Sequence, residues 1–146
     1  MGNSLLYSLP QNQINRLQRI QNTAARLVTL SRKSCHITPI LKQLHWLPVQ
    51  QRVIYKLMLI VFKSLNKMAP SYISDLLQPY KSLRILRSTS SSFLCVPRSN
   101  NSWGDMAFSV AAPRLWNSLP TQTKTSNSIP NFKKSLKTYL MAQAFT

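Results

Sequence analysis

The sequence predicts a mainly α-helical domain of about five helices with a small β-hairpin in its second half. Apolar residues recur at helical spacing in the first half and again near the C-terminus, and two short apolar runs lie between residues 93 and 110. The 146 residues are 44% hydrophobic, which is enough for one core. We expect residues 1–80 to form a helical core region. Residues 81–146 would hold a basic, Ser-rich loop, the hairpin and a C-terminal helix, packed with the first region as one domain.

The first helix is expected over 11–31, where apolar residues repeat with the spacing of one helical face. These residues are Ile14, Leu17, Ile20 or Gln21, Ala24, Leu27 and Val28. The other side of this helix is basic. Both a solvated polar face and contact with phosphate are open for that side, because Arg suits phosphate and no acid is near to pair with it.

The most apolar stretch runs over 36–77 and is expected to form the core. Thr38 and Pro39 fit the start of a short helix that ends near Trp46. Pro48 opens a long helix to about residue 67, whose apolar residues cover most of its circumference and therefore indicate burial on nearly all sides. Its charged residues are spaced by four, seven and four positions, which places them in one stripe.

A shorter helix is expected after Ser71 and before Pro79. Beyond residue 80 the chain becomes rich in Ser, Arg and Lys, and the short apolar run 93–96 is expected to pair with 103–110 as a β-hairpin. A helical turn follows over 111–120. A final helix begins at Ser128, with an apolar face and a basic face.

The charge balance is the clearest functional feature. The chain has 19 Lys and Arg against two Asp and no Glu, for a formal net charge of +17. Such a chain repels itself unless anions bind, and nucleic acid is the commonest suitable polyanion, with an anionic membrane surface second. Phosphate contacts would give salt-sensitive, weakly sequence-specific binding. The candidate nucleic-acid-binding residues are Arg16, Arg19, Arg26, Arg32, Lys33, Arg52, Lys56, Lys63, Lys67, Arg84, Arg87, Arg98, Lys133, Lys134 and Lys137.

The shortage of acids argues against catalysis. Two-metal nucleases and polymerases need several converging carboxylates, and paired-carboxylate glycosidases need two that face each other, whereas this chain has only Asp75 and Asp105, thirty residues apart. His36 and His45 are interpreted as a residue before a helix and a helix-end residue. We expect no cofactor and no metal, because the cysteines and histidines lack the spacing of a zinc site.

The cysteines and the N-terminus predict an intracellular protein, cytoplasmic or nuclear. Cys35 and Cys95 lie sixty residues apart and suggest free thiols in a reducing compartment. The first residues lack a basic run and a long apolar segment, so they do not read as a secretory signal. No membrane association is expected, since the apolar run 53–62 is too short to span a bilayer.

The three tryptophans allow two interpretations. Trp46, Trp103 and Trp116 could stack on bases, as aromatic side chains among Arg and Lys do. Each lies beside Leu, Ala or Phe residues, however, and this neighbourhood favours a place in the core.

Four segments, in this order, carry a resemblance that covers nearly the whole chain. They are Leu17–Val28, His36–Val49, Ala69–Leu77 and Ala107–Pro120. In these segments the chain resembles the C-terminal part of the polyprotein of non-LTR, LINE-like retrotransposons, the part that follows the fingers, palm and thumb of the reverse transcriptase. The Tyr-x-Asp-Asp signature of that enzyme is absent from this chain, as are its endonuclease and the Cys- and His-rich knuckle of some elements.

The resemblance therefore implies a noncatalytic fragment. Its expected partners are RNA or single-stranded DNA and, in a longer product, the upstream domains of the reverse transcriptase. The alternative is a structural or interaction remnant of a truncated element with no independent activity. An enzyme in its own right is a third class, which the missing carboxylates disfavour.

Overall fold

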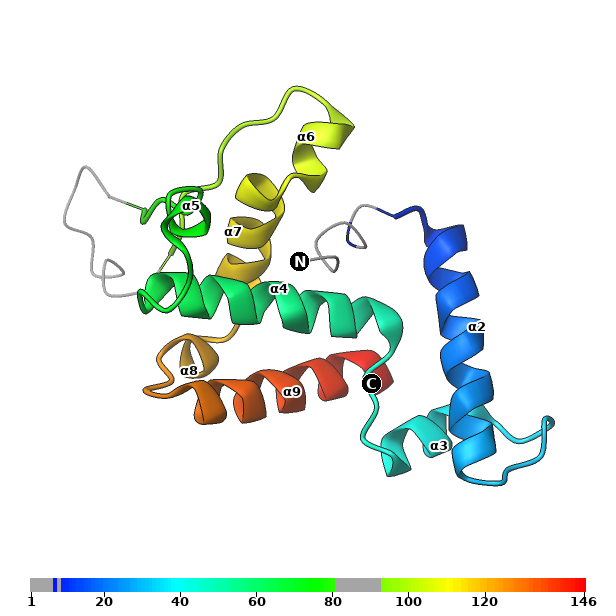
Figure 1. Cartoon of the computed structure of the whole chain (residues 1–146). Helices are drawn as coiled ribbons and strands as arrows, with labels where there is room; N and C mark the ends of the chain where they lie inside the picture. Colours follow the sequence, from blue (N-terminus) through cyan, green and yellow to red (C-terminus); the bar gives the residue numbers. More distant parts are fainter. Residues whose placement is uncertain (1–6, 8, 81–92) are drawn as a thin grey trace. The chain divides into compact units, whose positions relative to one another are not determined.

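A computed structural model of the chain describes residues 7, 9–80 and 93–146. Within these ranges it contains eight helices and no strand, which confirms the mainly α prediction (Figure 1). The predicted number of helices was too low because the short helices α6 and α8 were not expected, and because α7 was expected as a helical turn and part of a strand. The helices are α2 (Gln11–Val28), α3 (Ile37–Gln43), α4 (Val49–Leu65), α5 (Ser71–Ser74), α6 (Ser102–Met106), α7 (Phe108–Ser118), α8 (Thr121–Lys124) and α9 (Ile129–Phe145).

The contacts within the chain divide it into two compact units. The first comprises Met1–Tyr55 and Lys137–Thr146, and the second is Lys56–Leu136. The division falls inside the long helices α4 and α9. How the two regions expected from the sequence, 1–80 and 81–146, pack together stays a prediction.

In the first unit α2 packs on α3. A small core forms between them from Ala25, Ile40 and Leu41, with further apolar side chains around it from Ile37, Leu44, Trp46 and Phe145. The first turn of α4 is tied to α2 by two glutamines. The Val49 N–H donates to Gln18 Oε1 at 2.8 Å, and Gln21 Nε2 donates to the Leu47 carbonyl at 2.8 Å. Gln18 thus satisfies a backbone N–H that lies at the helix start and has no partner within α4.

Three helices end in the same cap, in which the residue after the C-cap takes a left-handed conformation. The N–H of this residue bonds to the carbonyl three positions before it at 3.0–3.3 Å, and the next N–H bonds five positions back at 2.8–3.0 Å, the pattern of a Schellman motif. Glycine is the usual residue there, but the two glycines of this chain lie elsewhere. The three left-handed residues are Leu30 (φ 51°), His45 (φ 51°) and Lys67 (φ 56°).

The core of the second unit is an aromatic cluster. Phe62 of α4 stacks on Phe132 of α9 with ring centroids 4.2 Å apart and an interplanar angle of 14°. Trp116 of α7 is tilted against Phe132 at 5.9 Å. All three rings are buried, so the second unit is built where α4, α7 and α9 meet.

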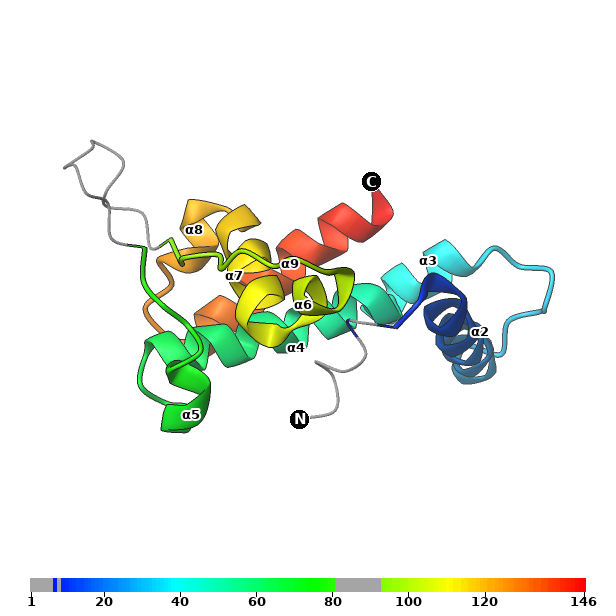
Figure 2. The ribbon, with the colours of Figure 1, turned by 90° about the horizontal axis from the view of Figure 1, so that it is seen from above.

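The predicted β-hairpin is wrong. Residues 103–110, expected to be a strand, belong to α6 and α7, which lie side by side in both ribbon views (Figures 1 and 2). The run 93–96 is extended, but it pairs with the segment before residue 81 through an isolated antiparallel bridge between Leu94 and Pro79. Backbone bonds flank this bridge, from Tyr80 N–H to the Phe93 carbonyl at 3.0 Å and from Cys95 N–H to the Gln78 carbonyl at 2.8 Å.

Candidate nucleic-acid interface

Most of the candidate basic residues are exposed. Arg84 and Arg87 lie outside the described residues, and Arg26 is half-buried, but every other candidate is exposed to solvent. They lie on α2, α4 and α9, in the turn after α2 and in the extended segment before α6. The structure thus leaves most of the positive charge of the described chain available to a polyanion.

Three of the four residues of the basic stripe predicted for the long helix lie on one exposed side of α4. Arg52, Lys56 and Lys63 are all exposed, while the neighbouring Val53 and Leu57 are buried. Lys67 lies two residues past the end of α4, where it occupies the left-handed position of the cap and is also exposed.

Arg26 has a structural role instead. Its Nη2 donates to the carbonyl of Cys35 at 3.2 Å, which ties α2 to the segment before α3. Its Nε is buried and has no partner within the described part of the protein. A guanidinium engaged in this way offers less to a phosphate than the exposed Arg16 and Arg19 on the same helix.

Trp103 is the functional candidate that sequence reasoning undervalued. The core interpretation is correct for the buried Trp116 and fits the half-buried Trp46, but Trp103 is 79% exposed on α6. An indole left in water forgoes the burial that makes aromatic side chains favourable in cores. The sequence pattern around it, apolar residues on the C-terminal side, could not separate a core position from an exposed one.

The turn that carries Trp103 is built closely around Gly104. Asn101 caps α6, with its Oδ1 accepting the Gly104 N–H at 2.6 Å, and Ser99 Oγ donates to the Asn101 carbonyl at 2.8 Å. A Cβ atom added to Gly104 would clash with Ser99 Oγ and would lie 2.8 Å from Asn101 Oδ1. Any larger residue at 104 would therefore have to displace the Ser99 hydroxyl and the capping oxygen of Asn101, which hold the turn beside the indole.

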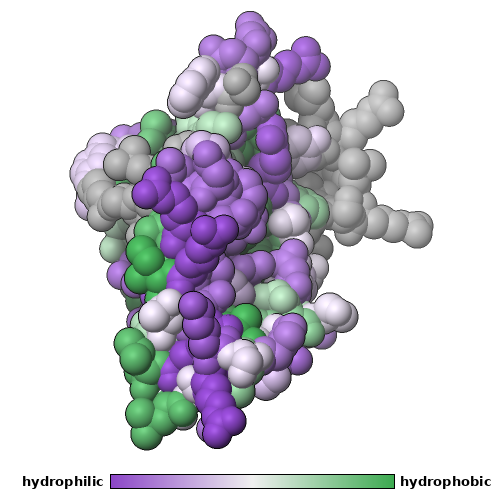
Figure 3. Space-filling view, turned by 90° about the vertical axis from the view of Figure 1, so that its right-hand side faces the viewer, coloured by the Kyte–Doolittle hydropathy of each residue, from purple (hydrophilic) through white to green (hydrophobic). Residues whose placement is uncertain are grey.

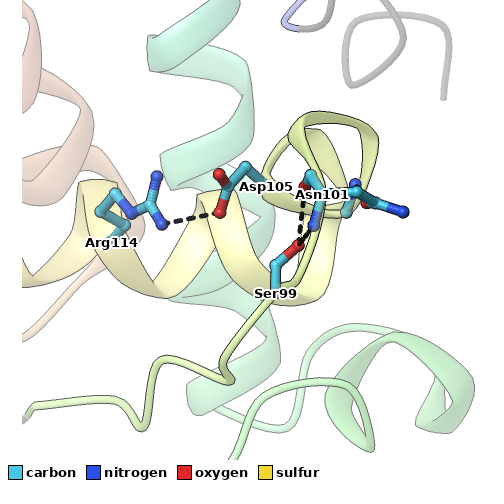
Figure 4. Close-up of polar contacts among 5 residues, drawn as sticks. Ser99, Asn101, Asp105 and Arg114 are labelled. Atoms are coloured by element: carbon cyan, nitrogen blue, oxygen red, sulfur yellow. Dashed lines mark hydrogen bonds and ion pairs between the residues drawn. The ribbon is translucent and has the colours of Figure 1, made fainter.

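An ion pair fastens the same turn to α7. Arg114 Nη2 lies 3.0 Å from Asp105 Oδ1, with both side chains about half exposed (Figure 4). A pair of this exposure adds at most about 1 kcal/mol to stability. Its main effect is geometric, because it joins α6 to α7 and occupies one of the two carboxylates in the chain.

Lys124 is a buried lysine that the sequence did not single out. Its Nζ donates to the Asn117 carbonyl at 2.9 Å and lies 4.7 Å from the centroid of the Phe93 ring. That carbonyl belongs to the last turn of α7, where carbonyls lack helical partners and attract cations. Burial lowers the pKa of Lys124 from its ordinary value of 10.5.

Asn117 itself holds the extended segment in place. Its side-chain Oδ1 accepts the Leu94 N–H at 2.9 Å, and its Nδ2 donates to the Leu94 carbonyl at 2.8 Å. The amide therefore replaces the neighbouring strand that the buried Leu94 backbone would otherwise need.

A pocket of about 380 Å³ lies beside Lys124 in the second unit. Its lining residues are Phe62, Leu65, Asn66, Trp116, Lys124, Thr125 and Ser126. The two aromatic rings are almost fully buried, so they offer no open face on which a base could stack. The Thr125 and Ser126 hydroxyls donate to backbone carbonyls at 3.1 and 2.9 Å, which leaves them as acceptors rather than donors for an anion.

No group of three or more potential metal ligands occurs within the described ranges. Cys35 and Cys95 are free thiols, the first exposed and the second half-buried, and His36 and His45 are exposed. Among the described helices, none combines the length and apolarity that crossing a bilayer requires.

Comparisons with protein-family models, with curated proteins and with solved structures found no match for this chain.

Proposed function

We propose that this chain is a noncatalytic segment that binds single-stranded nucleic acid, RNA or DNA, and that it derives from the C-terminal region of a non-LTR retrotransposon reverse transcriptase. The observation that carries the binding proposal is the 79% exposed Trp103, set on a tightly built turn of a chain with a net charge of +17. The origin rests on the sequence resemblance alone.

Charge supplies the affinity in this proposal. Exposed lysines and arginines displace the counterions that a polynucleotide holds, so the logarithm of the binding constant falls linearly with the logarithm of the salt concentration. For a single strand the slope is about −0.7 per neutralised phosphate, so contact with about five phosphates gives a slope near −3.5.

Stacking on Trp103 supplies the preference for single strands. Bases in a duplex have their faces covered by neighbouring pairs, whereas an unpaired base can lie flat on an indole. Each base stacked on an aromatic side chain contributes about 1–3 kcal/mol, with little dependence on which base it is. Arg98 is exposed in the segment that leads into α6, close to Trp103 in the sequence. In this proposal it contacts the phosphate next to the stacked base.

The test is a titration of labelled 15-nucleotide U and dT oligomers and of a duplex of equal length, followed by fluorescence anisotropy at several salt concentrations. Trp103→Ala should weaken binding to the single strands by about 5- to 150-fold at each salt concentration and leave the slope unchanged. Trp103→Phe, which keeps an aromatic face, should restore much of the loss. Unchanged binding by Trp103→Ala, or binding that ignores salt, contradicts the proposal.

The alternative of an interaction remnant is favoured by a different observation. Several large apolar side chains of α2 are exposed, and exposed apolar groups that gather on one surface are typical of sites that bind another protein.

A further inference from the structure

The exposed face of α2 carries an apolar strip. Its exposed fractions are 67% for Ile20, 71% for Leu27, 62% for Val28 and 93% for Leu30, and we call these four residues the α2 strip. Ile20 and Leu27 are seven positions apart, which places them on one side of the helix about two turns from each other, while Val28 lies about 80–100° around the helix from them. Figure 3, which views the molecule from the side of α2, shows apolar side chains among polar ones on this face.

Within the strip, Ile20 and Leu27 lie away from the face that α2 uses for its own core. The residues of α2 that are buried are Ile14, Gln21 and Ala25, and Ala25 belongs to the cluster shared with α3. At 100° per residue, Ile20 and Leu27 lie about 120–140° around the helix from the centre of that buried face. Part of the apolar face expected from the sequence is therefore in water, because the polar Gln21 takes the inward position.

Leu30 adds an independent observation. It sits in the left-handed position that ends α2, with φ of 51°, where glycine would fit without strain. Its side chain is 93% exposed. The cap bonds from Leu30 N–H to the Leu27 carbonyl at 3.3 Å and from Ser31 N–H to the Arg26 carbonyl at 3.0 Å hold the backbone, so a large apolar side chain stands in water at a position that needs none for the fold.

The charges beside the strip select its occupant. Arg16 and Arg19 are exposed on the same helix, and Arg32 and Lys33 follow Leu30. The first unit contains no acidic residue, since Asp75 and Asp105 both belong to the second. A second copy of the chain would place like charges against each other, which disfavours self-association. The complementary partner is acidic around an apolar centre.

A protein helix fits these features better than a lipid surface. Helices that lie in the membrane interface use Trp and Phe beside Leu as apolar anchors, and the α2 strip has aliphatic side chains alone. The spacing of seven between Ile20 and Leu27 matches the spacing with which one helix packs along another.

We propose that the α2 strip docks an acidic amphipathic helix of a partner protein, with apolar side chains at helical spacing against Ile20 and Leu27 and with Asp or Glu facing Arg16 and Arg19. The α2 strip belongs to the first unit and Trp103 to the second, and this inference goes beyond the proposed binding of nucleic acid.

The test uses the full chain and a labelled 21-residue helical peptide with Leu at heptad positions a and d and Glu at e and g. A second peptide replaces the four central Leu by Ser and keeps the Glu. The variant Ile20→Ser/Leu27→Ser removes the centre of the strip. The matched control is Met68→Ser/Leu76→Ser, which alters two exposed apolar residues of the second unit.

We expect Ile20→Ser/Leu27→Ser to bind the Leu peptide at least about tenfold more weakly, because each large apolar side chain contributes that much when buried. The control variant should bind the peptide like the wild type, and all three proteins should bind labelled U oligomers equally. If none of the three proteins binds the U oligomers, the proposed function fails, but the expected difference in peptide affinity still tests this inference.

Three outcomes overturn the inference. The first is equal peptide affinity of the wild type and Ile20→Ser/Leu27→Ser. The second is equally tight binding of the Ser peptide, which would reduce the interaction to charge. The third is failure of the Leu peptide to bind while vesicles containing 30% phosphatidylserine bind the wild type and lose affinity for Ile20→Ser/Leu27→Ser, since that result assigns the strip to membranes.

Discussion

The left-handed caps predict that glycine at position 67 stabilises the protein. Lys67 ends α4 with φ of 56°, and the cap bonds from Lys67 N–H to the Ser64 carbonyl at 3.2 Å and from Met68 N–H to the Lys63 carbonyl at 2.8 Å hold it there. A non-glycine residue in this conformation costs about 1–2 kcal/mol. Glycine removes that cost, but it also makes the unfolded chain more flexible, which favours unfolding by about 0.5–1 kcal/mol. The free energy of unfolding of Lys67→Gly should therefore rise by about 0.5–1 kcal/mol net.

Two control variants separate this effect from others. Lys67→Ala removes the same charge and side chain but keeps the strain, so it should show none of the gain. Lys56→Gly places glycine in the interior of α4 at another exposed lysine and should lose about 1 kcal/mol. The measurement is urea unfolding followed by circular dichroism at 222 nm. Equal stability of Lys67→Gly and Lys67→Ala would refute the reasoning, because it would mean that the backbone at 67 is not strained.

Three further predictions concern the second unit. Because burial lowers the pKa of Lys124 below 10.5, the folded protein releases this proton at a lower pH than the unfolded chain does. The free energy of unfolding, compared with that of Lys124→Met, should therefore rise as pH increases toward 10.5. Urea unfolding at pH 7.5 and pH 10 measures this difference, and a difference that does not change with pH would contradict the lowered pKa. Asn117→Ala leaves two groups of the buried Leu94 backbone unpaired and should cost about 1–3 kcal/mol by the same assay, whereas a loss below 0.5 kcal/mol would show that water replaces the amide. Gly104→Ala should distort the turn that carries Trp103, because the added Cβ clashes with Ser99 Oγ. The Trp fluorescence spectrum should change in this variant and not in the control Ser118→Ala. An unchanged spectrum of Gly104→Ala would mean that Ser99 moves aside.

The helices could be predicted where periodicity is strong. The apolar spacing of α2 and α4 and the cap before α9 were sufficient for those elements, and the charge spacing placed Arg52, Lys56 and Lys63 on one exposed stripe. These are local properties of the sequence, so no tertiary information is needed to find them.

The region 93–120 was harder for physical reasons. The run after Trp103 is short and apolar, and such runs do not distinguish a strand from a buried helix. Proline is disfavoured inside a helix, yet α7 continues through Pro113. The decisive contacts are tertiary: Asp105 with Arg114 fixes α6 on α7, and Asn117 takes the place of a partner strand for Leu94.

The exposed residues were the least predictable part of the candidate site. Whether Trp103 or Ile20 faces water depends on which side of its helix packs, and in α2 the inward position went to Gln21 because its amide bonds to the Leu47 carbonyl. The three left-handed caps lack the glycine that would have indicated them in the sequence.

The most direct test of the central claim is the affinity of the wild type, Trp103→Ala and Lys56→Ala/Lys63→Ala for a labelled U oligomer from 50 to 400 mM NaCl. The proposal predicts a steep salt dependence for the wild type, a lower but parallel line for Trp103→Ala, and a slope flatter by about 0.7 for each removed phosphate contact in the lysine variant. Lines for the three proteins that coincide, or that do not fall with salt, would contradict the assignment of this chain to single-stranded nucleic acid.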